Sequence, residues 1–571
     1  MLRVAGGARW RVLCLLRVVG SVGTWGGVAS GLVAALVVTG LPPQRAWAED
    51  PPVDDPAPEV SVPVAPLSVY FPSAVIQARA TGERVEVTGE RTESSTTWVN
   101  PDGTVTTTQH AAPVRFQDAE GAWQEFDTTL EERADGSIAP VAVPDPVVLA
   151  GSVEGTTADP APVASMDAGE GAQVAVAWEG ELSEPVLAGD AATYRGAWPG
   201  IDLVVHATRD GFEQSFVIAD REALLGYTGQ ASAGASDAGG DGGAGGVPAP
   251  VPVTGGRVSW DVPLVVSEDL TAREVAGERI EFVNGAGEVV SRFEAPLAWD
   301  AQVDAKSWEH VNHVPVTVAL VGQDAGRVTL RLSVDGGWLL DEGRVFPVTV
   351  DPVYASATAR PTFDAFVQSN ISTDRSSEQE LKAGTYDGTN KARSFLTFSN
   401  TSFKNVKIMS ATLNLYETWS YSCTPRAVEV WSVPTVVSSS VRWSNQPALG
   451  ARYGSVTVAK GANSSCAAGW VNIPVTGLVQ SWSSSSAGSV SLVVKAASET
   501  DVLGWKRFGS MESTTPPSIT FTYDRKPNLG TVPVVSNTGT YNSQSYVWKK
   551  RPVVSTTATD PDGNLVESSG V

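Results

Sequence analysis

The sequence predicts an all-β protein: several β-sandwich or jelly-roll units that follow a signal peptide and are joined by disordered linkers. Short runs alternate apolar and polar residues, as in Ala411–Tyr416, Val490–Val494 and Ile519–Tyr523. A two-residue period is typical of half-buried antiparallel strands. Clusters of Gly, Ser, Asn and Pro divide the runs, as in sandwiches and jelly rolls. The 571 residues leave room for several domains of about 100 to 200 residues each.

Residues 1–48 have the features of a secretory signal peptide. Four arginines precede an apolar stretch that is densest at Gly31–Gly40, and the small-x-small sequence AWA then ends at Ala48. We expect cleavage between Ala48 and Glu49. The alternative is an uncleaved membrane anchor over Val18–Leu41. With the signal removed, we expect no membrane contact.

Residues 49–66 are acidic and rich in proline, which predicts an extended, semi-rigid linker. Residues 67–354 carry β patterns throughout, with turn signals such as Asn100–Gly103 (NPDG). We interpret this region as one or two β-rich units. The run 229–246 consists mostly of Gly, Ala and Ser, cannot bury a core, and is expected to be a disordered loop.

The most informative stretch is 355–525, where short strands follow one another closely. It contains the cysteines that remain after removal of the leader, Cys423 and Cys466. An even pair in an exported domain indicates one disulfide. The alternative, a metal or redox pair, has no CxxC motif and no nearby histidine to support it.

This stretch resembles a DNRLRE domain, a relative of carbohydrate-binding module family 96. The segments that carry the resemblance are 364–370 (DAFVQSN), 392–398 (ARSFLTF), 410–416 (SATLNLY), 441–447 (VRWSNQP), 475–482 (VTGLVQSW) and the closing ITFTY. The resemblance implies a secreted, non-catalytic β-sandwich, often found before RHS/YD-repeat arrays or beside polysaccharide-degrading domains. Residues 192–218 and 343–354 resemble, more loosely, the region that precedes such domains in wall-associated RHS proteins.

Residues 526–571 resemble the opening strands of an immunoglobulin or fibronectin-like module, which needs about 100 residues. We therefore expect an incomplete module here and a longer parent protein, with a downstream RHS-repeat region as a candidate partner in the same chain.

The formal net charge is −23. Nucleic-acid binding requires a basic footprint, so a nucleic-acid partner is not expected. The chain contains no HExxH, GxSxG, P-loop or Rossmann motif, and His310 and His313 form only an HxxH beside a predicted strand. We predict that the chain is not an enzyme and needs no cofactor. A pair of carboxylates for glycoside hydrolysis has no sequence signature and stays open.

Tryptophans are the candidate ligand-binding residues. Sugar rings present apolar C–H faces that can stack on an exposed indole, whereas a buried indole fills a core. Trp443 and Trp482 lie in framework motifs and are expected in the core. The candidates in strand ends and loops are Trp419, Trp470 and Trp505, with Arg507 beside the last. Asp364 is a candidate ligand of a structural calcium ion.

Together these features predict a secreted, extracellular protein, with a place at the cell wall as one option. Its function would be binding or attachment to polysaccharide or cell-wall glycan through 355–525. One alternative is the structural N-terminal region of an RHS-type surface or toxin-delivery protein. Another is an accessory region of a polysaccharide-degrading enzyme whose catalytic domain lies elsewhere.

Overall fold

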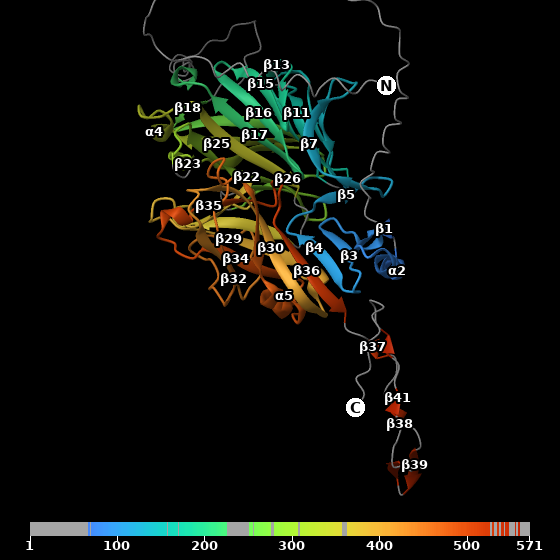
Figure 1. The fold of residues 1–571 in the computed structure, drawn as a ribbon. Coiled ribbons are helices and arrows are strands. Elements are labelled where there is room, and N and C mark those ends of the chain that lie inside the picture. Colours follow the sequence, from blue (N-terminus) through green and yellow to red (C-terminus); the bar gives the residue numbers. More distant parts are fainter. Residues whose placement is uncertain are drawn as a thin grey trace, which may run out of the picture. The chain divides into compact units, whose positions relative to one another are not determined.

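The computed structural model describes residues 67–559, apart from 69, 157, 169–170, 225–250, 255, 276–278, 306–308, 357–361, 526–527, 530–533, 536–537, 542, 548–553 and 556–557 (Figure 1). The predicted signal peptide with its Ala48/Glu49 cleavage, the linker 49–66 and the loop 229–246 lie outside these residues. Within the described residues, no helix has the length and apolar character that a membrane span requires. The all-β prediction is confirmed, because antiparallel sheets make up nearly all of the regular structure.

Residues 127–356 form a β-sandwich of two nine-stranded sheets, which we call the middle sandwich. One sheet has the order β24-β25-β19-β12-β11-β9-β8-β7, with β18 added beside β19. Its strands are β7 (Asp127–Glu132), β8 (Ile138–Ala142), β9 (Val147–Leu149), β11 (Ala161–Asp167), β12 (Gln173–Trp178), β18 (Val251–Thr254), β19 (Arg257–Val266), β24 (Thr317–Asp324) and β25 (Arg327–Asp335).

The other sheet of the middle sandwich has the order β14-β15-β16-β17-β26-β22-β21-β20, with β23 beside β22. Its strands are β14 (Val186–Ala188), β15 (Ala191–Trp198), β16 (Ile201–Ala207), β17 (Gly211–Ile218), β20 (Thr271–Val275), β21 (Arg279–Val283), β22 (Val289–Asp300), β23 (His313–Pro315) and β26 (Val348–Ser356). The two sheets bury a common apolar core; β19, for example, buries every second residue from Val258 to Val266. Short elements accompany them: β5 (Arg115–Gln117) with β6 (Trp123–Glu125), β10 (Val153–Gly155) with β13 (Gly180–Leu182), and α4 (Gly336–Leu339).

A second sandwich contains residues from both sides of the middle one in sequence, so we call it the composite sandwich. Its larger sheet has the order β1-β2-β3-β4-β36-β30-β35-β28, with β33 beside β30. The strands are β1 (Leu67–Ser68), β2 (Val85–Val87), β3 (Ser95–Val99), β4 (Val105–His110), β28 (Glu380–Ala383), β30 (Val406–Ser420), β33 (Gly469–Pro474), β35 (Lys506–Gly509) and β36 (Ser518–Arg525).

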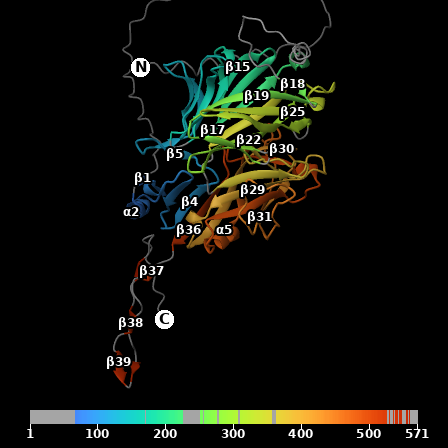
Figure 2. The ribbon, with the colours of Figure 1, turned by 180° about the vertical axis from the view of Figure 1, so that it is seen from behind.

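The smaller sheet of the composite sandwich has five strands in the order β27-β29-β34-β31-β32. They are β27 (Phe363–Gln368), β29 (Ala392–Ser399), β31 (Arg426–Ser432), β32 (Arg452–Val458) and β34 (Ser489–Ala496). Helix α5 (Thr476–Ser483) contributes Leu478 and Val479 to the core between the sheets. Figure 1 shows β30 and β36 of the larger sheet, and Figure 2 shows the molecule from the opposite side, where β29 and β31 are labelled.

The join between β4 and β36 makes the composite sandwich discontinuous in sequence. Six consecutive residue pairs connect the two strands, from His110 with Ser518 to Val105 with Tyr523. Residues 67–110, which were predicted to belong with 111–354, therefore extend the larger sheet of the 355–525 module. The domain boundaries themselves stay a prediction. The pairing of β4 with β36 nevertheless joins residues from both sides of the boundary expected near residue 355.

Helix α2 (Phe71–Thr81) was not expected, because β patterns were predicted throughout this region. It buries Phe71, Ala74, Val75 and Ala78 against the larger sheet, and it ends at Gly82 in the left-handed conformation (φ 72°). The spacing of the buried residues is that of one helix face, and Pro72 occupies the first turn. In the sequence, the helical spacing of these apolar residues, with Pro72 at the start and Gly82 after the end, was the available signal of a helix.

Residues 528–559 form nested antiparallel pairs. They are β37 (Asn528–Leu529) with β42 (Ala558–Thr559), β38 (Val534–Val535) with β41 (Val554–Ser555), and β39 (Thr538–Tyr541) with β40 (Gln544–Val547). The nesting is that of one long hairpin. The immunoglobulin-like module expected from 526–571 stays a prediction.

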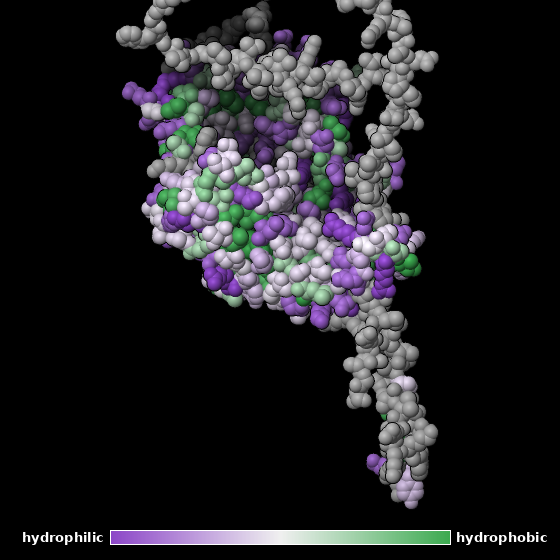
Figure 3. Space-filling model, viewed as in Figure 1, coloured by the Kyte–Doolittle hydropathy of each residue, from purple (hydrophilic) through white to green (hydrophobic). Residues whose placement is uncertain are grey.

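Polar contacts connect the two sandwiches. Glu309 of the middle sandwich accepts a hydrogen bond from Lys382 at 2.8 Å and forms an ion pair with Arg507 at 3.0 Å. Elsewhere Arg209 of the middle sandwich donates to the carbonyls of Met511 at 3.2 Å and Ser513 at 2.8 Å. Hydrophilic and hydrophobic residues are interspersed over the described surface seen in Figure 3.

Candidate functional site

The outer face of the larger sheet of the composite sandwich carries exposed aromatic and amide side chains. In β30 the alternation turns Leu413 and Leu415 into the core, as predicted, and leaves Asn414 and Tyr416 outside. The neighbouring strand β33 places Trp470 opposite Tyr416 and Asn472 opposite Asn414. Residues directly opposite one another share a face of the sheet. We call these four residues, Asn414, Tyr416, Trp470 and Asn472, the aromatic strip.

Trp470 is the most accessible ring of the strip, with 43% of its surface exposed. Its ring meets that of Tyr416 nearly edge-on, with 5.4 Å between the centroids and 83° between the planes. Edge-to-face pairs of this kind are favourable, and here the contact leaves the indole of Trp470 partly in solvent. The strip therefore presents one partly exposed aromatic ring that packs against a second ring on the outer face of the sheet.

A ladder of polar side chains continues the strip across β36 and β4. The Asn414 amide donates to the hydroxyls of Ser518 at 3.1 Å and Thr520 at 3.0 Å. Thr520 in turn lies 3.0 Å from the hydroxyl of Thr108, so that the ladder reaches the N-terminal strands. Cross-strand hydroxyl and amide pairs stabilise the sheet and fix the surface beside Tyr416.

Trp419 and Arg507 lie on the same face but contact each other. A bulge in β30 places Trp419 opposite Arg507 of β35. The guanidinium of Arg507 lies 5.6 Å from the centre of the Trp419 ring, and it forms ion pairs with Glu309 at 3.0 Å and Glu380 at 2.9 Å. Arg507 therefore covers part of Trp419 and connects the two sandwiches, whereas it was predicted from the sequence to contact a ligand.

Trp505 lies in the interior, in contrast to its expected position in an exposed loop. The residue is fully buried, and Tyr386 meets its ring edge-on at 5.4 Å. No face of the indole is open to a ligand in this arrangement, which gives Trp505 a packing role. Trp482 is buried as predicted, and Trp443 packs, half-buried, against a small cluster on the outer side of the five-stranded sheet.

The predicted disulfide is confirmed. Cys423, just after β30, bonds to Cys466, just before β33, with 2.04 Å between the sulfurs and 5.7 Å between the Cα atoms. The sequence separation is 43 residues. By the chain-entropy model, closing a loop of that length contributes about 4 kcal/mol. The bond also braces the loop that leads into Trp470.

Asp364 is buried in the composite sandwich, where its carboxylate accepts a hydrogen bond from the backbone N–H of Met511 at 2.8 Å. Burial raises the pKa of Asp364 to about 8. Burial and the neighbouring Asp364 also raise the pKa of Glu512 well above its usual range. The described residues include no group of three or more His, Cys, Asp or Glu side chains placed to hold a metal. Calcium at Asp364 stays a prediction.

The raised pKa of Asp364 predicts a pH dependence of stability. An unfolded aspartate titrates near about 4, so between about pH 4 and 8 the folded state binds more protons than the unfolded state. Stability attributable to this group is therefore full at low pH and declines as pH rises towards 8. Asp364→Asn should flatten the decline while an amide oxygen still accepts from Met511. Urea unfolding from pH 5 to 8 measures how the free energy of unfolding depends on pH. The control Glu131→Gln, at an exposed position, should keep the wild-type dependence. An unchanged dependence in Asp364→Asn would contradict the role given to the Asp364 carboxyl.

A β-sandwich with a partly exposed aromatic ring on the outer face of one sheet is an arrangement found in binding modules. Comparison with known families agrees, since residues 355–523 match the model of carbohydrate-binding module family 96. This confirms the resemblance to that module family inferred from the sequence. The relation to DNRLRE domains and to RHS-repeat proteins stays a prediction.

Two curated relatives are nucleases by name. The tRNA3(Ser)-specific nuclease WapA of Bacillus spizizenii is 32% identical over 238 residues, which is 39% of this chain and 10% of the relative. The tRNA nuclease WapA of Bacillus subtilis (strain 168) is 30% identical over 300 residues, or 49% of this chain and 12% of the relative. The chain thus spans about a tenth of the length of these relatives.

Among solved structures, an exo-beta-1,3-galactanase from Phanerochaete chrysosporium with galactose aligns over 76% of this chain and 94% of its own, with 10% identity and a TM-score of 0.12. A TM-score that low indicates neither a shared fold nor a shared activity.

Proposed function

We propose that this chain is a secreted, non-catalytic binding protein that attaches to polysaccharide, either cell-wall or environmental, through the aromatic strip. The observation that carries the proposal is Trp470, which is 43% exposed on the outer face of the larger sheet and packs edge-on against Tyr416. The match of residues 355–523 to carbohydrate-binding module family 96 supports the same class of ligand.

The chemistry of the strip suits a sugar ring. The apolar C–H face of a pyranose stacks on an indole and removes apolar surface from water. Asn472, exposed two residues from Trp470 on the same face, supplies an amide that both donates to and accepts from hydroxyls. A single exposed ring is expected to bind a sugar weakly. A polysaccharide repeats the ligand many times, and this repetition strengthens binding when several copies of the protein are linked together.

Trp470→Ala should weaken polysaccharide binding without unfolding the protein. Loss of one stacked and desolvated ring corresponds to about 1 to 2 kcal/mol, or about 5- to 30-fold in the dissociation constant. Affinity electrophoresis of the full chain, on polysaccharides chosen with a glycan array, measures the change. Tyr541→Ala is the matched control, since Tyr541 is 66% exposed on the C-terminal hairpin.

Equal retardation of the Trp470→Ala and wild-type chains would contradict the role of the strip. If the folded wild-type chain bound no glycan at all, the polysaccharide proposal would fail as a whole.

A second candidate function is favoured by the curated relatives. Both are named WapA nucleases, and the chain matches about a tenth of their length. We infer that the two sandwiches would then be the structural N-terminal region of an RHS-type surface or toxin-delivery protein. The reading frame downstream of residue 571 distinguishes the candidates: YD repeats followed by a toxin domain favour delivery, and a polysaccharide hydrolase domain favours an enzyme accessory region.

A further inference from the structure

The face that carries the aromatic strip continues beyond the strip onto the N-terminal strands. Strands β3, β4, β36 and β30 lie side by side, with β33 beyond β30, so Trp98 of β3 and Trp470 of β33 lie on opposite sides of the face (Figure 1). Trp98 pairs with Thr106 of β4, which pairs with Thr522 of β36, and directly opposite residues share a face. Thr520, two residues from Thr522, accepts from the amide of the strip. Trp98 therefore lies on the same face as the strip.

The two tryptophans mark opposite corners of this face. Four strand spacings separate β3 from β33, which amounts to about 19 Å across the strands. Along the strands, Trp98 is level with Ser410 and Trp470 is level with Tyr416, six residues further along β30. Six residues of a strand extend about 20 Å. The rings are therefore about 25 to 30 Å apart, and a ligand that reaches both must be a chain of several sugars.

Hydroxyl side chains occupy the face between the two rings. The hydroxyl of Thr106 lies 3.0 Å from that of Thr522, and the hydroxyl of Thr108 lies 3.0 Å from that of Thr520. A hydroxyl has one donor and two acceptor positions, so these contacts leave positions free for the hydroxyls of a ligand. Thr108, Thr520 and Thr522 are half-buried, and their outer sides reach solvent. None of these side chains is charged, which suits a neutral sugar chain.

Trp98 differs from the covered Trp419 in the arginine that lies over its ring. Trp98 is half-buried, and the guanidinium of Arg84 lies 4.9 Å from the centre of its ring. Arg84 is exposed and has no ion pair with any described residue. Arg507, which covers Trp419, is held by two glutamates. Arg84 can therefore move aside for a ligand, whereas Arg507 is fixed in place.

We propose that this face binds one extended chain of neutral, β-1,4-linked sugars, which crosses the strands from Trp470 to Trp98. The proposal rests on the proposed function and adds a second ring to it, supplied by strands outside the matched residues 355–523. Sugars joined in this way form a ribbon with apolar flat sides and hydroxyls along its edges. The flat sides stack on the two indoles, and the edges contact the threonine hydroxyls between them. A single sugar or a disaccharide reaches one ring only.

Titration calorimetry of the full chain tests the proposal with two probes, the β-1,4-linked dimer and hexamer of glucose. Trp98→Ala should weaken binding of the hexamer by about tenfold and leave binding of the dimer unchanged, because the dimer needs only Trp470. Trp470→Ala should weaken binding of both. Tyr453→Ala is the matched control, since it removes a ring that is 37% exposed on β32 of the smaller sheet, and it should change neither affinity.

Thr108→Lys provides a second test that keeps both rings. It places a long side chain in the path of the ligand, so it should also weaken binding of the hexamer alone. Thermal unfolding shows which variants fold, and Thr108→Lys decides the question if Trp98→Ala does not.

Three results would overturn the proposal: a wild-type chain that binds the hexamer no more tightly than the dimer, an unchanged affinity for the hexamer in folded Trp98→Ala or Thr108→Lys, or no binding of either oligomer. The second result, together with a loss of affinity in Trp470→Ala, would remove the extended site and keep the aromatic strip. Binding of another polysaccharide on the glycan array would likewise keep the strip while the neutral β-1,4-linked chain is ruled out.

Discussion

Lys506→Met should destabilise the composite sandwich by about 3 to 5 kcal/mol, because it leaves a buried charge without its partner. The Lys506 ammonium lies 2.6 Å from the Glu417 carboxylate, and the two side chains are 1% and 0% exposed. It also donates to the carbonyl of Val458 at 2.7 Å. Burial lowers the pKa of Lys506 and raises that of Glu417, while each charge opposes the shift of the other.

Removing both charges at once should cost far less. In Lys506→Met/Glu417→Met an apolar pair of similar volume replaces the ions, and such replacements are often neutral or stabilising. Arg331→Met is the surface control, since the Arg331–Asp261 pair has side chains that are 40% and 28% exposed. We expect no more than about 1 kcal/mol there. Urea unfolding of the wild-type protein and these three variants measures the differences, and a loss below about 1 kcal/mol in Lys506→Met would contradict this account.

The parts of the fold that depend on local pattern were predictable from the sequence. The alternation in Ala411–Tyr416 correctly assigned the inner and outer faces of β30, because a side chain's face in a strand follows from its neighbours. The pairing of Cys423 with Cys466 was also predictable, since the only other cysteine of the sequence, Cys14, lies in the predicted leader.

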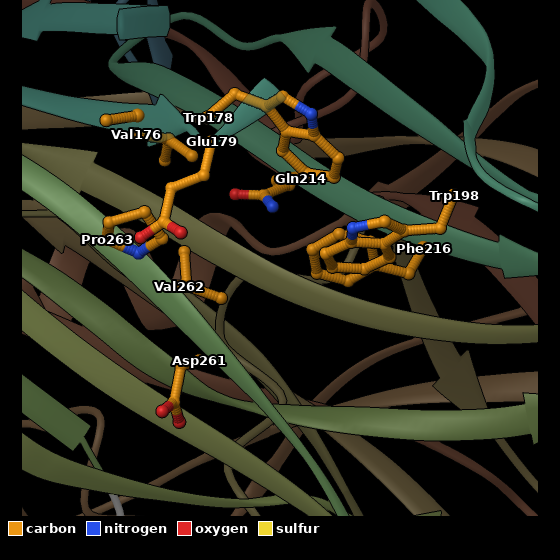
Figure 4. A pocket seen from close by; sticks show the side chains of 10 residues that line it. Val176, Trp178, Glu179, Trp198, Gln214, Phe216, Asp261, Val262 and Pro263 are labelled. Atoms are coloured by element: carbon orange, nitrogen blue, oxygen red, sulfur yellow. The ribbon is translucent and has the colours of Figure 1, made fainter. Parts of the chain in front are cut away.

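The parts that depend on distant residues were not predictable. Trp505 and Trp470 both follow a glycine or small-residue stretch, yet the first is buried and the second exposed. Arg507 pairs with Glu309, which no local pattern connects to it. Gln214 is a polar residue within the otherwise apolar core face of β17, and its surroundings depend on β12 and β19 of the opposite sheet, which no local pattern connects to it (Figure 4).

Deletion of residues 67–112 should prevent stable folding of the composite sandwich, although the family match begins only at residue 355. Without β4, strand β36 becomes the edge of the larger sheet and loses its whole ladder with Val105–His110. The deletion also uncovers the inner aromatic rings next to that edge, where Phe521 packs against Phe403 at 4.8 Å and Tyr523 at 5.2 Å.

The free energy lost with these buried side chains is large compared with the free energy of unfolding of a whole domain. Helix α2 and strands β2–β4 contribute several fully buried side chains to the core, among them Val85, Val99 and Val105. Burial of a valine or larger side chain is worth about 1.5 to 3 kcal/mol, and small domains are stable by only about 5 to 15 kcal/mol. An unpaired apolar edge strand also promotes aggregation.

Thermal unfolding and near-UV circular dichroism should therefore show no cooperative transition of the composite sandwich in the deleted chain. Deletion of residues 526–571 is the control, and it should leave the transition intact because the C-terminal hairpin pairs only with itself among the described residues.

Thr107→Pro is a milder form of the same change, since Thr107 pairs with Phe521 and proline removes an N–H from β4. A residue 355–525 fragment that unfolds at the wild-type temperature would refute the discontinuous fold, because the N-terminal strands would then add nothing to the stability of the module.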